Sequence, residues 1–180
     1  MHYSNCAALR SVMIRSWCWL AVCALFITPI AWSETLSLDQ IKAVMEGNWR
    51  LEESLDDNEL LHPPQADGRM SIHGGVIMIS MHREVQSTRK SFYGYGTYAF
   101  TPEAWSYGFD RYVSFIDTGT AITMGGAPFN GQRNYRFKNE GEKIIADFDN
   151  GVATFVFEGD KLTFLGKGKP VRKWRKISTE

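Results

Sequence analysis

The stretch KIIADFDNGVATFVFEGDKLTFL, residues 143–165, decides the fold class of this chain. Apolar and polar side chains alternate along it in short segments, which is typical of strands that bury one face. Two turn signals interrupt the alternation: Asn150-Gly151, a pair that accepts the positive φ angles of a primed hairpin turn, and Gly159-Asp160. The stretch therefore predicts two consecutive β-hairpins with two-residue loops, built from strands at 143–148, 152–158 and 161–165.

Short strands of the same kind are predicted on both sides of this stretch. Helices and strands do not alternate, so a parallel α/β sheet is excluded. About ten short strands at this spacing are typical of an all-β barrel or sandwich. Because closure removes the exposed edges of such a sheet, we predict an all-β fold, an up-and-down antiparallel β-barrel of about 8–10 strands over residues 47–177. The further strands are predicted at 49–53, 69–72, 76–83, 91–100, 104–109, 112–116, 132–138 and 171–177.

A single short helix is predicted before the barrel, within residues 34–46. Ser37 supplies an N-cap, Gln40 stands three residues on as in a capping box, and Gly47 offers a left-handed stop. An apolar stripe gives the helix one face to press against the barrel, so that it shuts one end. The stripe consists of Leu38, Ile41, Val44 and Met45.

Residues 1–33 have the pattern of a secretory signal peptide. Arg10 and Arg15 precede an apolar run at 17–30. Small residues then occupy the −3 and −1 positions of a cleavage site that ends at Ser33. The run is shorter than the roughly 18–20 residues that span a bilayer, which disfavours the alternative of a retained membrane anchor. We therefore expect cleavage after Ser33 and a periplasmic or secreted protein.

The composition of the remaining chain narrows the functional class. Lys and Arg together number 20, and so do Asp and Glu, so net charge does not favour nucleic acid as a partner. All three cysteines lie in the expected leader, which excludes a disulfide or a thiolate metal site after cleavage. The histidines of the remaining chain, His62, His73 and His82, lack the spacing of a zinc site. We therefore expect no metal and no cofactor.

Five short motifs occur in the order that one known family shows. Gly47-Asn48-Trp49-Arg50-Leu51 looks like a Gly-x-Trp opening of a first strand, and Trp174-Arg175-Lys176-Ile177 is similar to a Trp-x-Arg ending. The other three are Asp67-Gly68-Arg69-Met70-Ser71, Tyr95-Gly96-Thr97-Tyr98 and Gly159-Asp160-Lys161-Leu162-Thr163. Together they resemble the bacterial lipocalin-like domain family, within the calycin group of barrels. The resemblance implies a barrel with an apolar calyx, and it implies no reaction.

Trp49 is a candidate structural plug rather than a ligand contact. It shares one face of the first strand with Leu51 and Glu53, so its ring can close the barrel end while the indole N–H donates to a backbone carbonyl. A guanidinium from the last strand, Arg172 or Arg175, is expected to lie across the ring as a cation–π partner.

Two glycine-containing segments need separate interpretations. Residues 118–131, with Gly125-Gly126 and Pro128, have no counterpart in the family pattern. Gly94 and Gly96 mimic part of a dinucleotide fingerprint, but no helix follows them to hold a pyrophosphate. Spaced by two, they instead place small residues on one face of a strand, where another backbone or a ligand can approach.

Aromatic residues are densest between positions 93 and 115, which makes this part of the chain the candidate ligand site. Tyrosine and tryptophan line apolar cavities while offering a polar tip. The candidate anchors Arg111 and Arg133 can bind a carboxylate or sulfate. The alternative is that the rings fill a solid barrel, and alternation alone does not decide which strand face points inward. The candidate walls of the site are Tyr95, Trp105, Tyr107 and Tyr135.

The leading hypothesis is an exported, non-enzymatic barrel that binds a small apolar or amphipathic ligand. One alternative is a small enzyme of isomerase or hydrolase type that uses His82 with a neighbouring tyrosine or carboxylate. Another is a solid envelope interaction or inhibitor module that binds through its loops. The basic end of the chain predicts a solvated last strand, with contact to anionic lipid head groups as a further alternative. Its residues are Lys167, Lys169, Arg172, Lys173, Arg175 and Lys176.

Overall fold

The computed structural model describes residues 36–178. The expected signal peptide, residues 1–33, and its cleavage site after Ser33 lie outside the described residues. Within the described part, no helix combines the length and the apolar character needed to cross a membrane.

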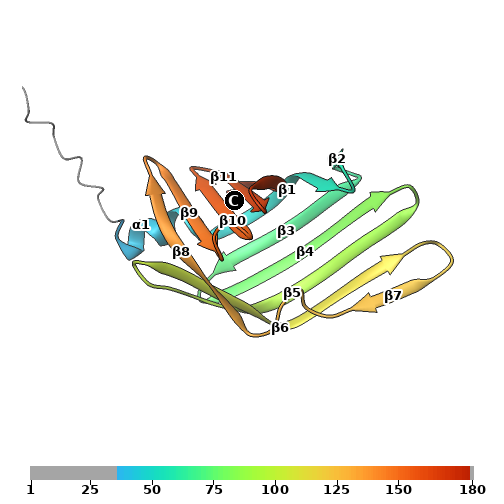
Figure 1. Ribbon diagram of the computed structural model, residues 1–180, viewed down its shortest axis with the longest axis horizontal. Helices are drawn as coiled ribbons and strands as arrows, with labels where there is room; N and C mark the ends of the chain where they lie inside the picture. Colours follow the sequence, from blue (N-terminus) through green and yellow to red (C-terminus); the bar gives the residue numbers. More distant parts are fainter. Residues whose placement is uncertain (1–35, 179–180) are drawn as a thin grey trace, which may run out of the picture. The chain divides into compact units, whose positions relative to one another are not determined.

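The described chain forms a closed antiparallel β-barrel of ten strands (Figure 1). Each barrel strand pairs with the next one along the chain, and the last pairs with the first, so the sheet has no open seam. The prediction of an all-β, up-and-down barrel is confirmed. The ten strands are β1 (Gly47–Asp56), β3 (Ala66–His73), β4 (Val76–Val85), β5 (Thr88–Phe100), β6 (Ala104–Asp117), β8 (Gln132–Glu140), β9 (Lys143–Phe148), β10 (Ala153–Glu158), β11 (Lys161–Gly166) and β12 (Lys169–Ile177).

Two short strands lie outside this ring, and the sequence pattern predicts neither. β2 (Glu59–Leu61) pairs with the last residues of β1, and β7 (Ile122–Gly125) pairs with the last residues of β6. β8 pairs with the first residues of β6, so the two ends of β6 have different neighbours (Figure 1). The segment 118–131 therefore leaves the barrel through β7 and returns to it at β8.

β6 is longer than predicted. The two strands expected at 104–109 and 112–116 form one continuous strand that passes through Asp110. The strand pairs with β5, and its register shifts between Tyr95 and Gly96, where Asp110 is the extra residue of a β-bulge. The bulge resets the alternation of the strand. As a result, Phe109 and Tyr112 both point into the barrel.

A second bulge corrects the predicted facing of β1. Trp49 and Leu51 point inward and are fully buried, but the register with β12 shifts between Leu51 and Glu53. Glu53 is therefore not on their face, and its carboxylate lies 2.7 Å from Nζ of Lys173. Asp56 takes a buried position further along the strand instead.

Only one of the two predicted hairpin loops has the expected length. The Gly159-Asp160 loop has two residues, as predicted. The loop around Asn150-Gly151 has four, because strand pairing ends at Phe148 and resumes at Ala153. Three successive residues in this loop, 149–151, take positive φ angles of 51°, 51° and 92°. Asn150-Gly151 therefore marks the turn as predicted, but the turn contains more than these two residues.

α1 (Leu38–Met45), the single helix among residues 36–178, begins with the predicted capping box. The Ser37 hydroxyl accepts from the Gln40 N–H at 3.2 Å, and the Gln40 side chain accepts from the Ser37 N–H at 2.7 Å. The predicted left-handed stop at Gly47 is wrong. Glu46 is an extended C-cap, and Gly47, with φ of 142°, is already the first residue of β1.

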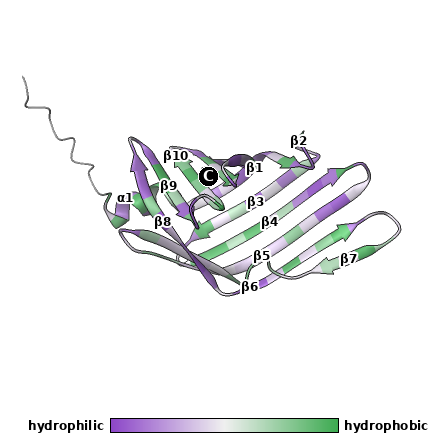
Figure 2. Ribbon diagram, viewed as in Figure 1, coloured by the Kyte–Doolittle hydropathy of each residue, from purple (hydrophilic) through white to green (hydrophobic). Residues whose placement is uncertain are grey.

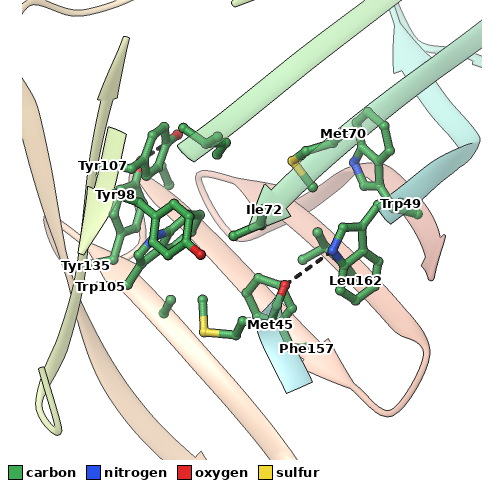
Figure 3. Packing of buried hydrophobic residues seen from close by; sticks show 14 of the residues in the cluster. Met45, Trp49, Met70, Ile72, Tyr98, Trp105, Tyr107, Tyr135, Phe157 and Leu162 are labelled. Carbon is green, nitrogen blue, oxygen red and sulfur yellow. Dashed lines mark hydrogen bonds between the residues drawn. The ribbon is translucent and has the colours of Figure 1, made fainter. Parts of the chain in front are cut away.

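The residues beside α1 form a densely packed closed end. The indole of Trp49 donates its N–H to the carbonyl oxygen of Met45 at 3.3 Å (Figure 3). Its ring meets Phe157 edge-to-face, with 5.7 Å between the centroids. Both the strand and the helix thus contribute to one core, in which Ile41 and Met45 of α1 are buried.

The cation over the Trp49 ring is Lys176, and not the predicted Arg172 or Arg175. Nζ of Lys176 lies 5.6 Å from the ring centroid and donates to two carbonyl oxygens at the end of α1. Arg175 follows the inward-pointing Trp174 and therefore faces out, where it binds two acidic side chains. Arg172 does point inward, but toward the other end of the barrel.

Candidate functional site

The half of the barrel beyond the closed end contains a cavity of about 270 Å³. Aromatic rings from β5, β6, β8, β10, β11 and β12 surround it, and aliphatic side chains of β3 and β4 complete the wall. The interior of the barrel is therefore not filled completely by its own side chains.

Four of the six predicted ligand-binding residues line this cavity together: Trp105, Tyr107, Arg133 and Tyr135. The ring of Tyr107 stacks on Trp105 at 4.6 Å and on Tyr135 at 5.3 Å between centroids. The Tyr135 hydroxyl donates to the Tyr107 hydroxyl at 3.3 Å (Figure 3). β6 and β8 thus present a continuous aromatic wall with a polar tip.

The other two predicted residues, Tyr95 and Arg111, do not line the cavity. They pair with each other across β5 and β6 on the outer face, where Tyr95 is 46% exposed. Gly94 and Gly96 take the inward positions on either side of Tyr95, so an offset of one residue removes it from the site. The same outer face is apolar along β7, which is green in Figure 2. Its exposed apolar side chains include Met78, Tyr93, Ile122 and Met124.

Arginines reach the cavity from three separate strands: Arg83 on β4, Arg133 on β8 and Arg172 on β12. None of the described residues that line the cavity carries a carboxylate. The sequence interpretation missed Arg83 and assigned Arg172 to the closed end. Alternation from Trp174, once that residue is known to point inward, is the signal that places Arg172 inside.

Two of these guanidinium groups lie over aromatic rings. The Arg133 guanidinium carbon is 4.0 Å from the centroid of Phe129 and 4.8 Å from that of Phe148. That of Arg172 is 5.6 Å from the centroid of Phe92 and 5.3 Å from that of Phe164. Stacking of this kind orients a guanidinium but leaves its N–H groups free to donate in the ring plane.

The charges in the cavity influence one another. Burial lowers the pKa of Arg172 to about 10, and the positive charge of Arg83 adds to this effect. Burial raises the pKa of Tyr107 well above its usual value, although the positive charges of Arg133 and Arg172 lower it in part. Burial also raises the pKa of Tyr112, although the positive charges of Arg172 and Arg83 lower it in part. Arg172 is therefore within electrostatic reach of both tyrosine hydroxyls and of a second guanidinium.

Several donors in this half of the barrel are buried without a hydrogen-bond partner. Among the described residues, no acceptor lies in range of Nε of Arg83, Nε of Arg172 or Nε1 of Trp105. All three residues line the cavity. Since more than about 90% of buried polar groups in proteins are paired, such donors are candidates for hydrogen bonds to a water, an ion or a ligand.

An acidic side chain beside the cavity, Asp56, is already shared by two cations. Its Oδ1 lies 3.1 Å from Nζ of Lys90 and 3.5 Å from Nη1 of Arg83. Lys90 also contacts Asp57 at 3.0 Å, and hydrogen bonds to Asp57 and Asp56 raise the pKa of the lysine. Only Oδ1 of Asp56 is thus engaged by Lys90 and Arg83, and its Oδ2 is buried without a hydrogen-bond partner among the described residues.

The segment 118–131 contributes part of the cavity wall, which the sequence interpretation did not foresee. Pro128 and Phe129 line the cavity where β6 and β8 separate. The Phe129 ring lies 5.6 Å from Tyr107 and 5.7 Å from Phe109 between centroids. The available signal was an apolar Pro-Phe pair inside a loop otherwise rich in glycine.

The enzyme hypothesis required His82 to meet a tyrosine or carboxylate inside the barrel. His82 lies on β4 between Met81 and Arg83, which both point inward, so its own side chain faces outward. Within residues 36–178, no three His, Cys, Asp or Glu side chains come close enough together to hold a metal ion.

A second hollow, of about 500 Å³, lies on the surface at the closed end around Gly47, Ser71 and Lys176. It is more open than the cavity, and small polar residues predominate in its lining. The surface hollow has neither aromatic walls nor buried donors, so the aromatic-walled cavity is the better candidate for a ligand site.

The basic residues near the end of the chain do not share one face. Arg172 points into the barrel, Lys173 contacts Glu53, and Lys176 caps α1. Arg175 lies outside, with its guanidinium 2.6 Å from a Glu52 carboxylate oxygen. These four residues therefore do not form one basic face, and contact with lipid head groups stays a prediction.

The chain matches no protein-family model, no curated protein and no solved structure. A closed antiparallel barrel of ten strands is compatible with the calycin-like fold that the resemblance implied. The functional conclusion therefore depends on the geometry of the cavity.

Proposed function

We propose that this protein is an exported lipocalin-like barrel that binds one small amphipathic ligand in its cavity. The observation that carries the proposal is an aromatic-walled cavity in which buried donors of Arg83, Trp105 and Arg172 have no partner among the described residues. An apolar body with a polar acceptor satisfies both the walls and the donors. Binding, rather than catalysis, is the function that this arrangement serves.

The size of the cavity limits the ligand. Its volume of about 270 Å³ lies at the lower edge of the range of about 300–1,000 Å³ that is typical of ligand pockets. A single ring with a short side chain suits this space better than a long-chain lipid. Tyr107 and Trp105, which stack on each other, offer the face on which such a ring would lie.

Export and membership of the lipocalin-like family are parts of the same proposal. The pattern of residues 1–33 supports export, and the five ordered motifs between Gly47 and Ile177 support the family. Mass spectrometry of the exported protein tests the first part, with an N-terminus at Glu34 as the expected result. An intact N-terminus would contradict cleavage while leaving the cavity proposal untouched.

The binding proposal is tested with phenylacetamide, an uncharged probe of suitable size. We expect saturable quenching of tryptophan fluorescence, because Trp105 and Trp174 both line the cavity. The variant Ala153→Phe fills the cavity from β10 and should abolish the quenching. The matched control Ala99→Phe adds the same ring on the exposed face of β5 and should bind like the wild type.

Two results would contradict the binding proposal. One is quenching that Ala153→Phe does not reduce, since the probe would then bind outside the cavity. The other is the absence of binding by any small ring compound, which would favour the interaction module. Native mass spectrometry of the purified protein, followed by organic extraction, provides an independent check for a ligand that co-purifies.

A further inference from the structure

We propose that the ligand carries one carboxylate and that Arg172 is the residue that binds it. The guanidiniums of Arg83, Arg133 and Arg172 form a ring around this carboxylate. The inference rests on the proposed binding function and names the chemical class of the ligand. It also assigns the main anchor to a residue of the last strand, Arg172, in place of Arg111 on the outer face.

The topology spaces the three arginines around the barrel. β4, β8 and β12 are separated by two, three and two strands in the closed ring. The residues that they contribute, Arg83, Arg133 and Arg172, all reach the same cavity. Positive charge therefore surrounds the cavity on all sides instead of lying along one wall.

Arg172 is the member of this ring that most needs a partner. Its Nε is buried and has no acceptor among the described residues. Arg83 already lies 3.5 Å from Asp56, and Arg133 is held over two rings. A carboxylate accepts two parallel N–H bonds from a guanidinium, so one such group satisfies the free Nε and balances the charge.

The protein itself does not supply that carboxylate. The cavity lining described here contains no Asp or Glu. Asp56 lies beside it with Oδ1 shared by Arg83 and Lys90, and its charge partly offsets the lowered pKa of Arg172, but no hydrogen bond or ion pair joins the two among the described residues. The hydroxyls of Tyr107 and Tyr112 lie within electrostatic reach of Arg172, and both remain protonated because burial raises the pKa of each. They are therefore available as neutral donors beside the bound anion.

The aromatic walls determine the remainder of the ligand. Below the ring of arginines, Trp105, Tyr107 and Tyr135 form stacked faces, and Phe155 meets Trp105 edge-on at 5.2 Å. These rings fill the space between one another, so a planar apolar body packs against the cavity side of the stack. The predicted ligand class is thus a small aromatic carboxylate.

The test compares phenylacetate with phenylacetamide by isothermal titration calorimetry on the whole protein. The two probes have nearly the same shape and differ in charge. We expect the wild type to bind the carboxylate at least about tenfold more tightly than the amide. Arg172→Met should reduce this preference to less than about twofold, because the carboxylate loses more affinity than the amide, which keeps the aromatic walls and the donors of Arg83 and Trp105. Arg172→Lys should retain part of the preference, and Arg111→Met, on the outer face, all of it.

Three other results of this titration would contradict the inference. Equal affinities in the wild type would overturn carboxylate recognition and leave the binding function intact. If Arg172→Met still prefers the carboxylate, the assignment to Arg172 is overturned. Binding of the amide by the same variant is the control that shows that its cavity is still formed. If the wild type binds neither probe, the proposed function fails, and this inference fails with it.

Discussion

Trp49 and Trp105 belong to one buried core and both contact Phe157, but they differ in one respect. Both are almost completely buried, at 0% and 1% exposure. The indole N–H of Trp49 donates to Met45 at 3.3 Å, whereas the indole N–H of Trp105 has no acceptor among the described residues. Trp49 lies under α1 in a packed core, and Trp105 lies in the wall of a cavity.

The same contrast extends to the neighbours of the two tryptophans. At the closed end, the Tyr98 hydroxyl donates to Glu46 at 2.6 Å, and Lys176 donates to carbonyl oxygens of α1. In the cavity half, the buried Nε atoms of Arg83 and Arg172 remain without an acceptor in the described part of the chain. Satisfied polar groups stabilise a fold, while unpaired ones destabilise it and persist where a site is kept ready for a partner. The polar groups near α1 are thus paired, while the cavity keeps the unpaired donors on which the proposed binding function rests.

The largest expected effect comes from Trp49→Ala at the closed end. The substitution removes a buried ring that contacts Phe157 and leaves a cavity under α1. We expect the free energy of unfolding, measured with urea, to fall by about 3–5 kcal/mol. The control Tyr93→Ala removes a ring that is 51% exposed and should cost less than about 1 kcal/mol. A similar loss in both variants would contradict the assignment of Trp49 as the plug.

A smaller loss is expected from Gly96→Ala, where the two halves meet. A Cβ atom at Gly96 would overlap the backbone carbonyl oxygen of Gly108, and backbone cannot rotate away as a side chain does. We expect thermal and urea unfolding to show a loss of about 3 kcal/mol. Gly126→Ala is the matched control, because nothing lies within 4 Å of its Cβ position. Equal stability of the two variants would show that β5 and β6 approach less closely than the bulge requires.

Arg172→Met should change stability in the opposite direction. Burial opposes the charge of Arg172 and lowers its pKa to about 10, so this charge destabilises the unliganded fold at neutral pH. A methionine of similar length should raise the free energy of unfolding by about 1–3 kcal/mol. Arg111→Met, on the outer face, should stay within about 0.5 kcal/mol of the wild type. A destabilised Arg172→Met would mean that its stacking on Phe92 and Phe164 outweighs desolvation, and the contrast between the two ends would disappear.

The fold was predictable because its signals are local. Alternation and turn residues such as Gly159-Asp160 report the strands, and Ser37 with Gln40 reports the capping box. The two bulges were not predictable, since nothing in the residues around Asp110 or Glu53 marks where pairing with the neighbouring strand shifts. The unpredicted pairing of β7 has the same cause, because it depends on the length by which β6 extends past β8.

The site was predictable only in part, because a cavity depends on which face of each strand points inward. Trp105, Tyr107, Arg133 and Tyr135 were correctly placed around one space, but a one-residue offset excluded Tyr95. Arg83 lies one strand before the aromatic cluster and was overlooked, whereas Arg172 comes from the last strand, far from the cluster in sequence. Closure of the sheet between β12 and β1 is what brings them into the same cavity, and no local pattern contains that information.

The smallest expected effect concerns the hydrogen bond between Tyr98 and Glu46 at the closed end. Burial, followed by this hydrogen bond, raises the pKa of Tyr98 to about 12. The group is an acid whose folded pKa exceeds its usual value of about 10, so its stabilising effect is complete below pH 10 and is lost as the pH rises toward 12.

Tyr98→Phe should therefore cost about 1 kcal/mol at pH 7, and its difference from the wild type should shrink between pH 10 and pH 12. The pKa values of Tyr107 and Tyr135 are also raised by burial, but they act equally in both proteins and cancel in the comparison. Urea unfolding at several pH values measures the difference, and Tyr95→Phe on the outer face should match the wild type throughout. Equal stability of the variant and the wild type at pH 7 would mean that packing of the ring, and not the hydroxyl, ties β5 to the residue that ends α1. A difference that stays constant up to pH 12 would contradict the titration of Tyr98 in this range.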